Sequence, residues 1–252
     1  MECHHQLIIH SKIFYLEEFL RNNYSILITS IEILAVFVGL IFYKKHKYSD
    51  AKYFIFILVY LFIIEFLGAY TIYVEKFEFL HNVKVALKDT LFEKNRWWFT
   101  LFWNIGGVLI FALYYQKVLK NKFYANLLKA STVIFLVFSF YIILSNWKDF
   151  FVKSFSSIDI AGALIIIQCA FYYFLEILSN ERVLKFYKDL NFYISIAILI
   201  FWLIISPLAF YEVYYSTADW NYIILKWQVY LFANLFLYGM FAIGLIISNP
   251  EK

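Results

Sequence analysis

The chain of 252 residues is 63% hydrophobic and only 16% charged, and its mean hydropathy is +0.71. A soluble domain averages about 45–50% apolar and about 25% charged residues, so this composition excludes an ordinary soluble domain. The net charge of +4 does not indicate nucleic-acid binding, because the lysines cluster in short loops beside apolar runs. The composition predicts an all-α polytopic membrane protein whose main partner is the lipid bilayer.

The first predicted element is an amphipathic segment at residues 1–23. Its apolar residues repeat with a helical period, at Ile9, Ile13, Leu16 and Leu20. We expect this segment to form a short interfacial helix on the outer membrane surface.

Seven apolar runs follow, and each is close to the roughly 20 residues that a membrane-spanning helix needs. They predict a seven-helix transmembrane bundle over 24–248, with spans at 24–43, 53–73, 97–116, 127–145, 157–178, 192–213 and 223–248. The fourth run is the weakest because it begins beside Lys129. Residues 74–96, between the second and third spans, are rich in charge and predict another short interfacial helix. Residues 249–252 form a tail.

Loop charges orient these spans. Lysine and arginine gather after the first, third and fifth spans, in the loops 44–52, 117–129 and 182–188. Because short basic loops stay in the cytoplasm, we expect the N-terminus outside and the C-terminus in the cytoplasm. This pattern predicts a multi-pass protein of the bacterial cytoplasmic (inner) membrane.

Polar side chains interrupt five of the predicted spans. Glu32, Glu65 and Asn104 lie about 10–12 Å below the outer ends of spans 1, 2 and 3, counted at about 1.5 Å per residue. Gln168 and Asn234 lie deeper in spans 5 and 7. Polar groups at such depth usually face the bundle interior or a wet cavity. We expect Glu32, Glu65 and Asn104 to form a polar layer that opens outward, and Gln168 and Asn234 are further candidates for lining its pocket.

Glu32 and Glu65 are the most informative pair of that layer. Two carboxylates at one depth on consecutive helices repel each other, so we expect one or both to be protonated. Three interpretations stay open: interhelical hydrogen bonding that only stabilises the bundle, a ligand-binding pocket, and an ion or proton pathway. Pro207, in the outer third of span 6, is a candidate hinge because proline kinks a helix.

Glycines in two spans predict close helix packing. Gly106 and Gly107 lie together in span 3, and Gly239 and Gly244 lie in span 7. Small residues let helix backbones approach one another inside a membrane, so packing is the interpretation for all four.

Enzymatic motifs are missing from the sequence. There is no G-x-S-x-G, H-E-x-x-H or P-loop motif. The histidines lie outside the predicted spans, which argues against a membrane haem, and MECHHQ matches no standard zinc pattern. We therefore predict no catalytic residue, no metal and no cofactor, and the chain is not expected to be an enzyme.

Three stretches carry a resemblance to known proteins. NFYISIAILIFWLIISPLAFYEVYY, ADWNYIILKWQVYLFANLFLYGMF and FEKNRWWFTLFW resemble a family of uncharacterised bacterial seven-span membrane proteins. The resemblance covers nearly the whole chain and implies the fold, but no activity. In layout alone, the chain also resembles the seven-span sensor modules of some bacterial histidine kinases. Only SNPEK follows the last predicted span, so a sensor would need a separate cytoplasmic partner.

Two functions follow from these observations. The first is a receptor-like or signal-relaying subunit, in which an outward-facing polar pocket acts on a cytoplasmic signalling protein docked on the basic loops 44–52 and 117–129. The alternative is a small-solute or proton-coupled transporter that uses the intramembrane carboxylates. A transporter predicts polar residues that continue to the inner face, and the inner halves of spans 1 to 3 are almost uniformly apolar.

Overall fold

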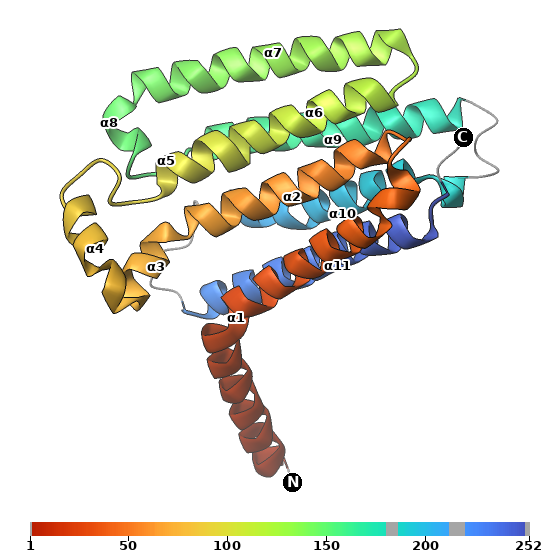
Figure 1. The fold of residues 1–252 in the computed structure, drawn as a ribbon. Helices are drawn as coiled ribbons and strands as arrows, with labels where there is room; N and C mark the ends of the chain where they lie inside the picture. The colour runs from red at the N-terminus through yellow and green to blue at the C-terminus, as the bar shows by residue number, and fades with distance from the viewer. Residues whose placement is uncertain (1, 180–185, 212–219, 250–252) are drawn as a thin grey trace.

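The computed structural model describes residues 2–179, 186–211 and 220–249, and it is 87% helical with no strand in these ranges (Figure 1). The side chains of residues 2–17 are not among those described. The predicted all-helical fold is confirmed. Of the predicted tail, residues 250–252 lie outside the described residues.

The first half of the chain forms two long helices, several short ones and a segmented third rod. In order, these elements are α1 (Glu2–His46), α2 (Ala51–Gly68), α3 (Tyr70–Lys76), η1 (Glu78–Leu80), α4 (His81–Leu87), α5 (Arg96–Trp98), η2 (Phe99–Gly106) and α6 (Gly107–Val118). The segment η2 is π-helical and joins α5 to α6.

The second half contains four long helices. Its elements are α7 (Lys122–Ser145), α8 (Trp147–Phe150), α9 (Ser156–Leu178), η4 (Phe186–Lys188), α10 (Leu190–Tyr211) and α11 (Trp220–Ile247).

Among the described residues, six helical stretches are long and apolar enough to cross a membrane, which confirms the expectation of a multi-pass membrane protein. They are Asn23–His46, Ala51–Gly68, Arg96–Val118, Lys122–Ser145, Ser156–Leu178 and Tyr222–Ile247. In the sixth predicted span, the described part of α10 has a shorter apolar stretch, Leu190–Ile205.

The long helices lie side by side (Figure 1). Helix α9 packs against α6, α7 and α10, while α11 packs between α10 and α1, and α2 joins α1 to α6. Helices α3, α4 and α8 gather at one end, which we call the loop-helix end. The turns after α1 and α6 lie at the opposite end, which we call the lysine-rich end and define by residues 44–52, 117–122 and 186–189.

Several predicted boundaries differ from the structure. Helix α1 runs without a break through the predicted boundary between 23 and 24 and continues to His46, so the prediction that every histidine lies outside a span is wrong for His46. The predicted basic loop 117–129 is mostly helical, because α7 already begins at Lys122. The Asn121 side chain accepts a hydrogen bond from the Phe123 amide and starts that helix early (2.9 Å).

The two predicted outer segments are helical to different extents. Residues 74–96 contain α3, η1 and α4, followed by turns. In the predicted amphipathic segment, the side chain of Leu20 is buried, and Ile9, Ile13 and Leu16 lie outside the residues whose side chains are described. The first turns of α1 extend away from the other helices (Figure 1).

The outer faces of the bundle are apolar. Helix α7 exposes a row of large hydrophobic side chains, namely Val133, Ile134, Val137, Phe140, Tyr141 and Leu144. Such a surface is unfavourable in water and matches hydrocarbon, which agrees with a helix that lies in a bilayer.

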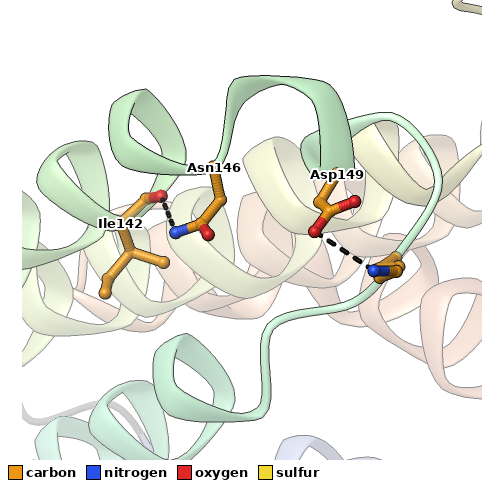
Figure 2. A network of polar contacts seen from close by, with 4 residues as sticks. Ile142, Asn146 and Asp149 are labelled. Atoms are coloured by element: carbon orange, nitrogen blue, oxygen red, sulfur yellow. Dashed lines mark hydrogen bonds and ion pairs between the residues drawn. The ribbon is translucent and has the colours of Figure 1, made fainter.

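Helix α7 ends at the loop-helix end in a polar corner (Figure 2). The Asn146 side chain donates to the Ile142 carbonyl oxygen (3.0 Å), which satisfies one of the carbonyls that a helix end leaves unpaired. Lys153, which follows the short helix α8, forms an ion pair with Asp149 of that helix (3.1 Å). Both residues of this pair are exposed, so it contributes little to stability.

Close packing at glycine is confirmed for Gly244 and is wrong for Gly239. A Cβ atom on Gly244 would lie 2.7 Å from the Tyr193 Cβ atom, so α10 and α11 touch there. A Cβ atom on Gly239 would have nothing within 4 Å. In span 3, a Cβ atom on Gly106 would lie 2.5 Å from the Tyr60 hydroxyl oxygen, whereas Gly107 makes only ordinary contact.

This difference predicts opposite effects of two alanine substitutions on one helix. Gly244→Ala forces α10 and α11 apart and lowers the free energy of unfolding by about 1–3 kcal/mol. Gly239→Ala is the matched control, and it raises helix stability by up to about 1 kcal/mol. Thermal unfolding midpoints in detergent measure both, and a midpoint of Gly244→Ala at or above that of Gly239→Ala would contradict the packing.

Candidate functional site

The turn between α1 and α2 places Glu32 and Glu65 at one level. Glu32 lies 14 residues before His46, and Glu65 lies 14 residues after Ala51, so both lie about 21 Å from the turn. The turn is closed by Ser49, whose amide and hydroxyl group both donate to the His46 carbonyl oxygen (3.0 Å each). The equal spacing in this hairpin brings the two glutamates together.

The Glu32 and Glu65 carboxyl groups contact each other, and Glu32 also contacts the Tyr238 hydroxyl group of α11. Glu32 and Tyr238 are each only 4% exposed, and Glu65 is half-buried. Within the described part of the chain, the Glu32 Oε2 atom is buried without a hydrogen-bond partner. We call Glu32, Glu65 and Tyr238 the carboxyl site.

The chemistry of the carboxyl site follows from its apolar surroundings. Two carboxylates in contact inside a bundle repel each other unless a proton or another cation lies between them. The free Oε2 atom of Glu32 is an acceptor available to such a cation. Around the site, Tyr24 interacts with Glu65 and its ring stacks on that of Trp227 (5.7 Å between centroids). The arrangement can hold a proton or a small cationic group.

Asn104 lies in the π-helical segment and does not join the carboxyl site directly. Its Nδ2 atom donates to Asp159 Oδ1 of α9 (2.6 Å). The sequence analysis missed Asp159. A carboxylate within the fifth apolar run was the signal that could have identified it. Tyr230 of α11 interacts electrostatically with both Asp159 and Tyr24, so these groups surround the same part of the bundle.

The π-helical segment is held against α2 by hydrogen bonds to backbone carbonyls. Tyr60 donates to the Phe102 carbonyl oxygen (2.8 Å), and Trp98 donates to the Ile64 carbonyl oxygen (2.8 Å). Asn95 donates to the Gly68 carbonyl oxygen at the end of α2 (2.7 Å). Because π-helical turns occur often at functional sites, this segment supports a site at the adjoining part of α2.

The other sequence-predicted residues have separate partners. Gln168 donates to Ser131 of α7 (3.1 Å) and to Tyr172 of its own helix (2.7 Å). Asn234 donates to the Tyr230 carbonyl oxygen one turn earlier (2.8 Å). The Pro207 side chain is exposed inside α10. The structure thus brings Glu32 and Glu65 together, and it leaves the remaining predicted residues at other contacts.

A second polar cluster lies near the lysine-rich end, and sequence reasoning missed it. Tyr173 of α9 donates to Asp189 Oδ2 (2.8 Å), and Asn191 donates to Asp189 Oδ1 through its amide and its side chain (2.9 and 3.0 Å). The Tyr114 hydroxyl group of α6 donates to Asn191 Oδ1. We call Tyr114, Tyr173, Asp189 and Asn191 the inner network. The signal was available, because polar residues cluster where spans 3 and 5 end and span 6 begins.

Neighbouring contacts tie the lysine-rich end together. Lys45 donates to the Ile246 carbonyl oxygen (2.8 Å), and His46 Nε2 contacts the Leu245 carbonyl oxygen (3.0 Å), so the end of α1 is joined to the last turn of α11. Glu176 accepts the backbone amides of Lys120 and Asn121 (2.9–3.1 Å), just before α7 begins. A carboxylate at a helix start is favoured by the helix dipole.

Two cavities lie at the same end. One has a volume of about 20 Å³ and is bordered by Glu176 and by Tyr173, Asp189 and Asn191 of the inner network. The other has a volume of about 320 Å³ and lies between Lys120, Tyr124 and Ser179. The smaller cavity is large enough for about one water molecule, and it offers the polar partners that a buried water needs.

In the described ranges, no group of three or more His, Cys, Asp or Glu side chains is placed so that it could hold a metal ion. Comparison of the chain with protein-family models, with curated proteins and with solved structures found no match.

The contact between Glu32 and Tyr238 predicts a loss of stability when the hydroxyl group is removed. Tyr238→Phe leaves a buried carboxyl group with one partner fewer and lowers the free energy of unfolding by about 1–2 kcal/mol. Tyr48, which is 91% exposed, provides the matched control. Tyr48→Phe leaves the thermal unfolding midpoint unchanged, and equal midpoints for the two variants would show that the Tyr238 hydroxyl group does not support Glu32.

Proposed function

We propose that the chain is a seven-span protein of the bacterial inner membrane, with its N-terminus outside and its C-terminus in the cytoplasm. The span in addition to the six long apolar stretches is α10, the sixth in chain order, which lies between α9 and α11 and whose 22 residues extend about 33 Å. The lysine-rich end then faces the cytoplasm, as short basic loops do. Helices α3 and α4, and the start of α1, lie at the outer interface.

Within this topology, we propose a receptor-like, signal-relaying subunit without enzymatic activity. The carboxyl site is the sensor, and it responds to a proton or a cationic ligand that reaches it from outside. One observation carries the proposal: α1 and α11 are joined twice, by Glu32 and Tyr238 at the sensor, and by Lys45 and His46 to the last turn of α11 at the lysine-rich end.

The relay follows from these two joints. A change in charge at the carboxyl site changes the repulsion between Glu32 and Glu65, and therefore the preferred separation of α1 and α2. Because a helix is stiff over a few turns, a shift of α1 at Glu32 is carried to His46, about 21 Å away. There it alters the contacts that close the lysine-rich end.

The output surface in this proposal is the lysine-rich end. Lys44 lies in the last turn of the sensor helix α1 and Lys47 follows it, while Lys120 precedes α7 and Lys122 is its first residue. These lysines present a positive surface, which favours a cytoplasmic signalling protein with an acidic docking face. A seven-span bundle that acts on a separate cytoplasmic protein also fits the resemblance in layout to the sensor modules of histidine kinases.

The relay predicts a movement at the lysine-rich end when the carboxyl site changes charge. Spin labels on Tyr48→Cys and Phe123→Cys, both exposed positions, report the distance between the end of α1 and the start of α7. A Cys3→Ser background avoids a third label, because Cys169 is buried. Acidification of the protein in nanodiscs shifts this distance distribution, and Glu65→Gln removes the response.

Glu75→Gln is the matched control, since Glu75 is an exposed acid on α3. This variant keeps the wild-type response to acidification. An unchanged distance in the wild type, or a full response in Glu65→Gln, would reject the sensor role. A pull-down with the lysine-rich end that recovers no partner would count against the output surface.

A further inference from the structure

Two polar regions of the bundle are connected by a continuous row of aromatic rings. The row begins at Tyr238 in the carboxyl site, whose ring lies 5.9 Å from that of Phe241. Phe241 lies 4.9 Å from Phe54, and Phe54 lies 6.1 Å from Tyr114 of the inner network. Two phenyl rings therefore separate one hydroxyl-bearing ring from the other.

The inner side of this row continues to the surface through polar groups. Tyr114 donates to Asn191, which donates to Asp189, and Tyr173 donates to Asp189 as well. The cavity of about 20 Å³ beside Asp189 has room for about one water molecule. A second hydroxyl pair, Tyr115 and Ser195, lies beside the network (2.7 Å).

The outer side of the row is the carboxyl site, which lies near the end of α2. Glu65 lies three residues before the end of α2, a rise of about 4.5 Å, and it is half-buried rather than enclosed. Tyr24 interacts with Glu65 from the neighbouring helix. Protons thus have polar groups to reach on both sides of the two phenyl rings.

Phe54 and Phe241 form the apolar barrier between these regions. Both are fully buried, at 0% and 1% exposure, and their rings meet nearly perpendicular, at 79°. A phenyl ring offers no group that can pass a proton along a hydrogen-bonded chain. In channels, hydrophobic constrictions of this kind gate conduction by excluding water.

We propose that the protein passes protons across the membrane and that Phe54 and Phe241 are its gate. A proton enters on the carboxyl site from outside. When the rings part, transient water links the Tyr238 hydroxyl group to Tyr114, and each hydroxyl oxygen accepts one proton as it releases another. The Asn191 amide accepts this proton on Oδ1 and releases one from Nδ2 to Asp189, and then returns to its usual tautomer. The proton leaves through Asp189, so only O–H and N–H bonds form and break, and the proton gradient supplies the driving force.

This inference rests on the carboxyl site of the proposed function, but it does not require the relay along α1. The transporter alternative allows either a small solute or protons as the substrate, and this inference selects protons. The inner network supplies the polar residues at the inner face that the transporter alternative requires, and they come from α6, α9 and the start of α10 rather than from spans 1 and 2.

The test is proton flux into liposomes that contain the purified chain and a trapped pH-sensitive dye, with a potassium gradient and valinomycin to set the membrane potential. Phe54→Ala opens the barrier to water and raises the flux at least about tenfold over the wild type. Phe56 is the matched control, because it lies on the same helix but is 54% exposed. Phe56→Ala keeps the wild-type flux.

A second pair of variants protects the test against misfolding. Phe54→Tyr keeps the ring and adds a hydroxyl group to the barrier between Tyr238 and Tyr114. It therefore raises the flux without opening a cavity, and Phe56→Tyr is its control. Glu65→Gln lowers the flux in the wild type and in Phe54→Tyr, whereas Glu75→Gln does not. Thermal unfolding midpoints identify any variant that has lost the fold.

Two outcomes overturn the gate. Flux equal to that of empty liposomes in the wild type and in both Phe54 variants rejects proton passage, and equal flux in the Phe54 and Phe56 variants rejects the barrier. The spin-label response separates this inference from the sensor role. Movement without flux removes only the proton pathway, and flux without movement removes only the relay.

Discussion

Two carboxyl groups inside an apolar helical bundle impose the constraint around which this structure is arranged. Glu32 is buried, Glu65 is half-buried, and their carboxyl groups contact each other, so two negative charges would repel there. Such a pair is tolerated only where the two carboxyl groups share a proton or cation and a third side chain contacts one of them. Tyr238 adds it, so α11 has to pack over the α1–α2 hairpin at that level.

Polar groups elsewhere in the bundle are satisfied in the same manner, across helices rather than by solvent. Tyr60 and Trp98 bond to carbonyl oxygens of the π-helical segment and of α2, and Glu176 caps the backbone before α7. Within hydrocarbon there is no water to pair with these groups, so each helix end and each irregular turn needs a partner from another helix. These contacts fix the relative depth of the helices, and with it the level of the carboxyl site.

The two ends of the bundle are connected by different physical means. Along α1, the connection is mechanical, because a stiff helix joins Glu32 to the contacts of His46 with α11. Through the core, it is a row of aromatic rings from Tyr238 to Tyr114, with polar groups at both ends. The first route suits a relay of movement, and the second suits a gated passage of protons. Both begin at the carboxyl site.

The sequence by itself was sufficient for the membrane character, because hydropathy and helix length are properties of contiguous residues. It also identified Glu32 and Glu65, since a charged residue stands out within an apolar run. It could not give the partners of Gln168 and Asn234, because no periodicity reveals Ser131 or the Tyr230 carbonyl oxygen as their neighbours.

Only the tertiary structure decided which groups meet. Asp189 and Asn191 lie in a polar stretch at the start of α10, and only the fold sets them against Tyr173 of α9 and Tyr114 of α6. Gly239 and Gly244 are the same residue on the same helix, and only Gly244 touches a neighbour. The physical reason is that apolar burial within a membrane depends little on which helices are neighbours, whereas hydrogen bonds and close contacts depend on the rotation and depth of each helix, which are settled by all the helices together.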